Sequence, residues 1–191
     1  MLNIILLITI LIFLSVVFYK LSQKFLFTSY VKSNIDNKYY RVKNGKNSQK
    51  AADALATINL DLQTVILKAK QNKHLFPKNV DLMCSRYSPG SLTENIDLNS
   101  TSYTMNKGDE IAFCVSTRDS EQKMYDKNLL LFVSIHELAH IGCESIGHGK
   151  EFRDFFKFLI EQAIECGVYT YIDYTKVPTE YCGMIINSTP V

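Results

Sequence analysis

The chain has 191 residues, of which 47% are hydrophobic and 21% are charged, and its formal net charge is +2. This composition is typical of one ordinary globular domain and excludes a disordered or fibrous protein. The charge is unevenly distributed, because residues 20–50 carry eight basic side chains and one acid (+7), whereas residues 51–191 carry 13 basic and 18 acidic side chains (−5). Phosphate-backbone binding needs clustered lysine and arginine, so the composition disfavours nucleic acid as a partner of the domain.

The N-terminus begins with an apolar run, Leu2–Phe18, which three polar residues interrupt. At about 1.5 Å per residue, a helix of this length covers about 26 Å, close to the thickness of a hydrocarbon core. No basic residue precedes the run and no small-residue cleavage site follows it, which argues against a cleaved signal peptide. The sequence therefore predicts a transmembrane anchor over residues 1–19.

A basic stem over residues 20–49 is expected to follow this anchor. Because the nearby positive charge lies on its C-terminal side, we expect a single-pass membrane protein of a host or virion membrane with its catalytic domain in the cytosol. The basic stem would then be attracted to the anionic lipid bilayer.

The remaining residues, 50–191, predict one α+β domain with a small, mostly antiparallel sheet. Helical spacing of apolar residues predicts a helix over Ala51–Gln71 with Ser48 near its N-cap, a buried helix over Leu129–Ile141, and an amphipathic helix from Lys150 to Gly167. Turn residues 106–109 between two short runs predict a β-hairpin with arms Thr101–Met105 and Glu110–Val115. A further strand is expected at Val80–Ser85, a polar linker at Lys32–Gln49, and a tyrosine-rich tail that wraps over the core.

Five cysteines occur without any Cys-x-x-Cys pair: Cys84, Cys114, Cys143, Cys166 and Cys182. Their odd number and spacing favour free thiols in a reducing compartment over a disulfide framework. Asn99 and Asn187 begin glycosylation triplets, which matter only for a domain outside the cytosol.

Three of the four histidines lie within thirteen residues, in His136-Glu137-Leu138-Ala139-His140 and the following His148. On a helix, His136 and His140 are one turn apart on one face, so both imidazoles can bind one Zn²⁺ ion. Glu137 stands where a carboxylate can take a proton from an activated water. This pattern predicts a hydrolytic zinc site.

A catalytic zinc usually has three protein ligands, and His148 is the expected third, because Gly147 allows the chain to turn back towards the helix. Glu161 and Glu165 compete for this role, and Glu144 is a weaker candidate. His74 is expected on the surface. Tyr174 and Tyr181 are both candidates for a hydrogen-bond donor to the oxyanion that hydrolysis generates.

The motif His136-Glu137-x-x-His140, with His148-Gly149-x-x-Phe152 opening a phenylalanine-rich helix, resembles the WLM/SprT-like zinc metallopeptidases. The resemblance covers Leu129–Gly167, about a fifth of the chain. A metzincin pattern fails, because it requires glycine and histidine where this chain has Cys143 and Ile146. The layout is also similar to membrane-anchored metallopeptidases of large DNA viruses, through the N-terminal run, the helix near Ala51 and Tyr181-Cys182-Gly183.

The resemblance implies a zincin-like fold with His136, His140 and His148 as zinc ligands and Glu137 as general base. It also implies that a sheet-edge strand, for which the Thr101–Val115 hairpin is the candidate, pairs with an extended protein or peptide substrate. The sequence thus predicts a zinc metalloendopeptidase. The first alternative is a membrane-anchored structural or assembly protein whose zinc is not catalytic, with Cys143 as a fourth ligand. The second is a secreted or luminal binding protein. The oligomeric state is not predicted.

Overall fold

A computed structural model describes the backbone of residues 2–190 and the side chains of all of these except residues 2–3 and 20–25. Lys20 and Lys24 of the predicted stem therefore lie outside the described side chains. In chain order the elements are α1 (Leu2–Phe27), β1 (Thr28–Lys32), β2 (Tyr39–Lys43), α2 (Ser48–Gln71), η1 (Lys73–Leu75), α3 (Pro77–Arg86), η2 (Pro89–Ser91), β3 (Leu92–Glu94), β4 (Tyr103–Met105), β5 (Glu110–Phe113), α4 (Lys127–Gly142), α5 (Lys150–Glu165), β6 (Thr179–Tyr181) and β7 (Met184–Ile186).

The larger sheet has five strands in the order β1-β2-β3-β5-β4. β1 pairs with β2 and β4 pairs with β5 antiparallel, whereas β3 is parallel to both of its neighbours. The sheet is therefore mixed, not mostly antiparallel as expected, and β4 is an edge strand. β6 and β7 form a separate antiparallel hairpin near the C-terminus. The predicted hairpin around residues 106–109 is confirmed as β4–β5.

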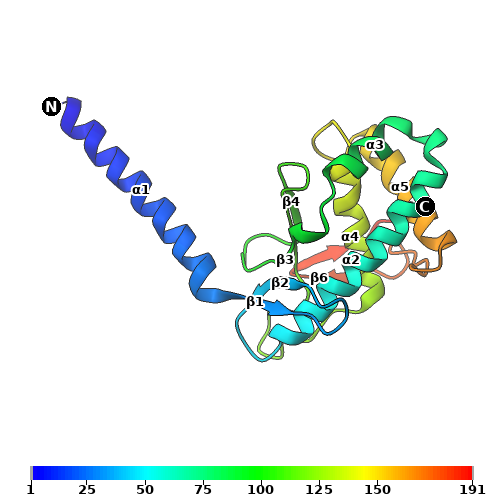
Figure 1. The fold of residues 1–191 in the computed structure, drawn as a ribbon, viewed down its shortest axis with the longest axis horizontal. Coiled ribbons are helices and arrows are strands. Elements are labelled where there is room, and N and C mark those ends of the chain that lie inside the picture. The colour runs from blue at the N-terminus through cyan, green and yellow to red at the C-terminus, as the bar shows by residue number, and fades with distance from the viewer. Residues whose placement is uncertain (1, 191) are drawn as a thin grey trace.

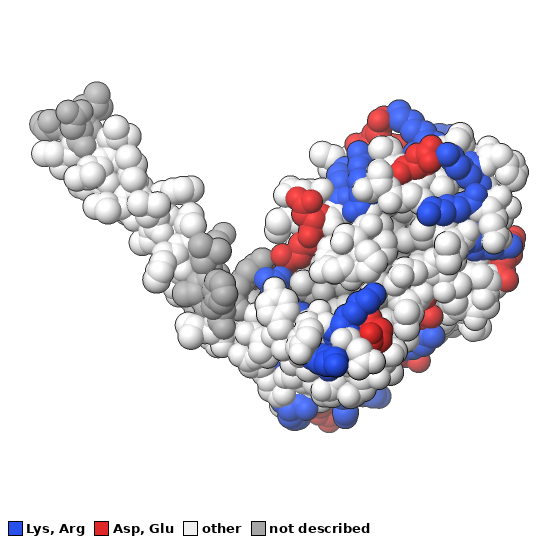
Figure 2. Space-filling view, in the orientation of Figure 1, with Lys and Arg blue, Asp and Glu red and all other residues white. Residues whose placement is uncertain are grey.

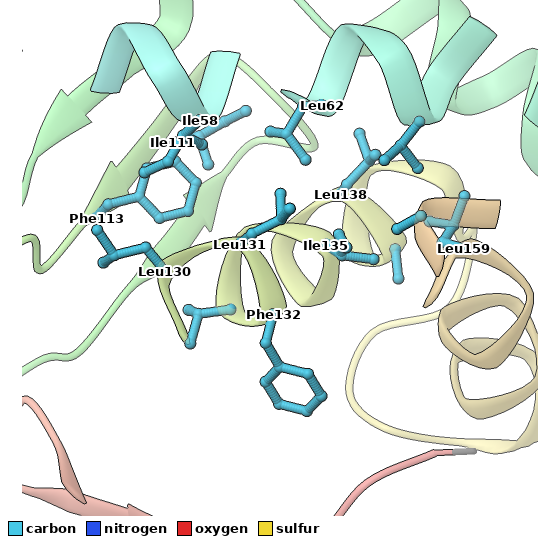
Figure 3. Packing of buried hydrophobic residues seen from close by; sticks show 14 of the residues in the cluster. Ile58, Leu62, Ile111, Phe113, Leu130, Leu131, Phe132, Ile135, Leu138 and Leu159 are labelled. Carbon is cyan, nitrogen blue, oxygen red and sulfur yellow. The ribbon is translucent and has the colours of Figure 1, made fainter. Parts of the chain in front are cut away.

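Helix α4 lies at the centre of the domain, where it packs against α2, α3 and α5 and also contacts β4. All residues from Leu129 to Ile135 are buried, as expected for a helix that is apolar on every side. In Figure 3, Leu131 and Leu138 point towards Leu62 of α2, whereas Phe132 points to the opposite side. The core therefore fixes one face of α4 and leaves the other side of this helix available to the site.

The three predicted helices of the domain are confirmed as α2, α4 and α5. Gly167, with φ +76°, follows the end of α5 as predicted. The tyrosine-rich tail does cover the core, because Tyr169, Tyr174 and Tyr181 are all buried.

Two local predictions differ from the structure. Residues 77–86 form helix α3 and not a strand, since its buried residues Val80 and Met83 are three positions apart, which is a helical spacing. The predicted linker contains β2, whose buried residues Tyr40 and Val42 alternate with more exposed neighbours. This strand is only half buried and lies within a polar, basic stretch, so its signal in the sequence is weak.

The prediction of a transmembrane helix is wrong. Helix α1 includes the apolar run and extends away from the domain (Figure 1), but no helix in the described part of the chain is both long and apolar enough to cross a membrane. The run of 17 residues is shorter than the roughly 20 that a span ordinarily requires. The expected single-pass topology with a cytosolic domain rested on that helix and is corrected with it. The contact of Leu2–Phe18 and the basic stem with a lipid bilayer stays a prediction.

Figure 2 shows basic and acidic side chains interspersed over the domain, while the described side chains of α1 on this face are uncharged. Several opposite charges form ion pairs, for example Lys73 with Asp81 at 2.7 Å and Lys68 with Glu165 at 3.0 Å. The face seen in this view thus carries no extended basic patch.

One disulfide forms, although the number and spacing of the cysteines argued against a disulfide framework. Cys114, just after β5, and Cys182, in the β6–β7 turn, form a disulfide, whereas Cys84, Cys143 and Cys166 are free. The two bonded residues are 68 positions apart, but their Cα atoms are 6.2 Å apart. Only the tertiary fold brings them together, so their spacing in the sequence gave no sign of the bond.

Candidate metal centre

The two histidines of α4 and the histidine of the following loop meet at one point. Their Nε2 atoms form a triangle with sides of 3.2 Å (His136–His140), 3.2 Å (His140–His148) and 3.1 Å (His136–His148). Nitrogens 2.0–2.1 Å from a tetrahedral zinc ion are expected about 3.3–3.4 Å apart. The triangle thus has about the size that a zinc ion requires. Among the described residues, these three form the group of side chains able to hold a metal ion.

The environment of His136 and His140 favours the neutral imidazole, which is the form that binds metals. Burial and, to a smaller extent, the neighbouring His140 and His148 together lower the pKa of His136 to about 3. Burial, His148 and Lys107 lower the pKa of His140 to about 4. Neither ring therefore needs to lose a proton before it binds a cation at neutral pH.

Phe152, from the first turn of α5, lies behind all three rings. Its ring stacks on His140 with centroids 4.2 Å apart, and it meets His136 and His148 edge-on at 4.8 and 4.7 Å. The side chain is 2% exposed, so it closes the inner side of the triangle. The aromatic residue of the sequence motif therefore limits how far each imidazole can rotate.

The loop that carries His148 is held by Glu151. Its carboxylate accepts hydrogen bonds from the backbone N–H groups of Glu144 and Ser145, both at 3.1 Å, from the Ser145 hydroxyl, and from Asn79 Nδ2 at 3.0 Å. The Ser145 hydroxyl and these other donors lower the pKa of Glu151 to about 2, although burial acts in the opposite direction. Gly147, with φ +84°, then allows the chain to reverse just before His148.

Basic side chains hold the C-terminal end of α4 from the other side. Lys107 Nζ donates to the carbonyls of Cys143 (3.0 Å) and Ser145 (2.8 Å), and Arg86 Nη1 donates to that of Ile141 (3.0 Å). These carbonyls have no partner within the helix, and cations are stabilising at this end of the helix dipole. The last turn of α4, which carries His140, is thereby fixed.

Glu137 lies beside the triangle and is 5% exposed. Burial raises the pKa of its carboxyl to about 7, while a hydrogen bond from Thr104 Oγ1, 2.9 Å from its Oε2, acts in the opposite direction. Thr104 belongs to the edge strand β4, so this contact joins the site helix to the sheet. Sequence reasoning missed Thr104, because nothing in the local pattern links residue 104 to residue 137.

A cavity of about 1290 Å³ opens over the histidines and Glu137. It is bordered by the β4 segment, by α4 and α5, by the His148 loop, and by Tyr181 and residues 184–190. Tyr181 therefore lies at the cavity, with its hydroxyl hydrogen-bonded to that of Ser102. Tyr174 is absent from the lining and packs on Phe132, with ring centroids 4.7 Å apart.

The competing ligands lie elsewhere. Glu144 forms an ion pair with Lys78 at 2.5 Å, Glu165 pairs with Lys68 at 3.0 Å, and Glu161 lies 3.9 Å from Lys157. Cys143 is buried, with its sulfur 3.9 Å from Asn79 Nδ2. His74 belongs to η1 and is not part of the triangle.

The comparison with known proteins gives viral relatives. The chain is 37% identical over 163 residues to "Uncharacterized protein R325" of Acanthamoeba polyphaga mimivirus, and the match covers 83% of this chain and 82% of that protein. The chain belongs to the family of this mimivirus protein. Two relatives match a shorter part of this chain. "Uncharacterized protein 136R" of Invertebrate iridescent virus 6 is 40% identical over 76 residues, which are 39% of this chain and 40% of that protein. "Uncharacterized protein 042R" of Invertebrate iridescent virus 3 is 48% identical over 69 residues, which are 36% of this chain and 42% of that protein.

These relatives are viral proteins, which supports the viral origin that the similarity of layout predicted. No protein-family model matches the chain. No solved structure matches it either. The WLM/SprT-like assignment therefore rests on the motif residues and their geometry.

Proposed function

We propose that this chain is a zinc-dependent metalloendopeptidase with His136, His140 and His148 as zinc ligands and Glu137 as general base. One observation carries the proposal: the triangle of imidazole nitrogens borders an open cavity that a buried carboxylate also lines. Three imidazoles are a donor set that suits zinc. The resemblance of the motif to WLM/SprT-like metallopeptidases supports the same assignment.

A zinc ion bound by His136, His140 and His148 would supply Lewis-acid chemistry, acidifying a water molecule towards a pKa of about 7 and polarising the scissile carbonyl. The side chains of the protein perform the remaining steps. Glu137, oriented by Thr104, accepts the proton of the attacking water and delivers it to the leaving amine. The hydroxyl of Tyr181 is a phenolic donor at the cavity and is placed to hydrogen-bond the oxyanion. The edge strand β4 pairs with the extended peptide.

A purely structural zinc site is the alternative, and the surroundings of the triangle favour catalysis over it. Structural zinc is normally enclosed by four protein ligands, whereas catalytic zinc keeps a position open for water. Among the described residues, three side chains form the metal group, and the triangle faces the cavity. Cys143, the candidate fourth ligand, does not belong to that group.

The test is the zinc content of the full-length protein after dialysis against a weak chelator, measured by mass spectrometry. The proposal expects about one zinc ion per chain in the wild type, in Glu137→Gln and in the control His74→Ala. It expects a loss of zinc in His148→Ala and proteolysis of unfolded casein by the wild type and His74→Ala alone. Full zinc occupancy in His148→Ala would remove this residue from the ligand set. A zinc-loaded wild type without any proteolysis would support the structural alternative.

A further inference from the structure

The cavity over the metal centre is bordered on one side by an open strand edge. Six residues of the β4 segment line it, namely Thr101, Ser102, Tyr103, Thr104, Asn106 and Lys107, whereas no residue of β5 does. Successive side chains of a strand point to opposite faces of a sheet. β4 itself contributes Tyr103 and Thr104, whose side chains point to opposite faces, and the other four residues flank the strand. The edge of β4, and not one face, therefore borders the cavity.

The opposite side has a second edge of the same kind. All residues from Met184 to Pro190 line the cavity, whereas Tyr181 is the single residue of β6 that does so. The side of β7 that does not pair with β6 therefore lies towards the cavity. Within the described residues, the backbone of residues 184–190 makes no backbone–backbone hydrogen bond other than its pairing with β6. Such an unpaired edge is a template for a further strand.

The side chains between the two edges are mostly apolar. Phe132 and Val133 of α4 and Phe156 of α5 line the cavity, and on β7 Met184 and Ile185 are 46% and 54% exposed. In Figure 3 the Phe132 side chain points to the side of α4 opposite Leu62 of α2. Apolar contacts of this kind bind the side chains of an extended peptide, while the two edges bind its backbone.

The second edge is fixed to the domain at the β6–β7 turn. The Cys114–Cys182 disulfide joins this turn to the end of β5. The Cys182 N–H also donates to the Tyr125 hydroxyl at 2.6 Å, and Arg118 Nη1 donates to the Cys182 carbonyl at 3.4 Å. The hairpin is therefore held at its turn, next to the cavity.

We propose that the cavity binds its peptide as one extended strand paired along both sides, with β4 on one side and with β7 and residues 187–190 on the other. The substrate class is then an unfolded protein segment, a terminus or a long loop with apolar side chains, because a helix or a paired strand cannot offer both backbone edges. This inference rests on the proposed peptidase function, since the peptide is bound in order to reach the metal centre.

The test is a backbone N-methyl scan with zinc-loaded, full-length Glu137→Gln. The probe is a fluorescein-labelled decapeptide from an array of overlapping casein peptides. It is the peptide that the wild type cleaves fastest or, if the wild type cleaves none of them, the peptide that binds most tightly. Successive N–H groups of a strand point to opposite edges. Pairing on both sides therefore predicts that methylation at odd and at even central positions each weakens binding by about three- to tenfold. Sensitivity at alternate positions only, or at none, would overturn the proposal.

The disulfide provides a second arm of this test. In the double variant Cys114→Ser/Cys182→Ser the second edge is no longer fixed. The loss of binding affinity on methylation should therefore become about threefold or more smaller at either the odd or the even positions of the peptide, and should persist at the other set. Unchanged sensitivity at both parities would contradict the role given to the hairpin. If this variant does not fold, the scan on the disulfide-bonded protein decides alone.

The outcomes also separate this inference from the proposed function. Hydrolysis by the wild type together with sensitivity at one parity would keep the peptidase and overturn the second edge. Binding with sensitivity at both parities, without hydrolysis by the zinc-loaded wild type, would keep the two-sided strand and overturn the peptidase.

Discussion

At the scale of single residues, the site depends on contacts between its side chains and more distant parts of the chain. Glu137 is buried, and its carboxylate accepts a hydrogen bond from Thr104, 33 positions earlier in the sequence. This contact orients the carboxylate with respect to the cavity, so Thr104 is a positioning residue for the proposed base.

Thr104→Val removes this hydrogen bond with little change in side-chain shape. We expect kcat for peptide hydrolysis to fall about tenfold, because a hydrogen bond to a charged group contributes about 1.5–3 kcal/mol, while KM and zinc content stay unchanged. Thr104→Ser keeps the hydroxyl and should keep most of the activity. Equal kcat values for the valine and serine variants would contradict this role.

Tyr181 and Tyr174 form a matched pair for the oxyanion donor, because both are buried tyrosines but only Tyr181 lines the cavity. Tyr181→Phe should lower kcat about tenfold or more, with the zinc content unchanged. Tyr174→Phe serves as the control and should leave kcat within about twofold. Steady-state kinetics at saturating peptide distinguish them, and equal effects of the two variants would assign Tyr181 to packing.

At the scale of elements, periodicity was sufficient for the long helices and insufficient for short segments. The apolar spacing in α2, α4 and α5 predicted these helices and the adjacency of His136 and His140. The strand β2 was missed because it has two buried residues within a basic stretch, and α3 was predicted as a strand because a short apolar run suits either structure. Contacts such as Glu151 with the His148 loop depend on tertiary structure, and no local pattern encodes them.

The loop between α4 and α5 gives a prediction at this scale. Glu151→Ala removes the acceptor of four hydrogen bonds that fix this loop, so His148 should be less well placed. We expect zinc affinity, measured by competition with a chromogenic chelator, to fall about tenfold. Glu161→Ala, the same change on the same helix at a residue that makes none of these bonds, is the control. An unchanged affinity in Glu151→Ala would contradict the role given to this carboxylate.

At the scale of the whole molecule, strands of two separate sheets, which a disulfide connects, border the cavity. The central helix presents the motif residues, the five-stranded sheet supplies one edge and the C-terminal hairpin supplies the other. The motif alone predicted the chemistry, but the shape of the cavity depends on residues 181–190, which lie more than 40 positions after Glu137.

The disulfide should contribute strongly to stability, because it closes a loop of 68 residues. The loss of chain entropy in the unfolded state predicts that reduction lowers the free energy of unfolding by about 4 kcal/mol. Urea unfolding with and without a phosphine reductant measures this difference. Cys84→Ser, which removes a free thiol, is the control and should leave the oxidised midpoint nearly unchanged. Identical midpoints for oxidised and reduced wild type would contradict the prediction.

The most direct test of the proposed function compares zinc-loaded wild type with Glu137→Gln at equal zinc content. The measurement is the initial rate of hydrolysis of unfolded casein by the full-length proteins. Loss of the general base should lower this rate by at least about a hundredfold while zinc stays bound. Equal rates in the two proteins, or no hydrolysis by the zinc-loaded wild type, would contradict the assignment of Glu137 and of the peptidase function.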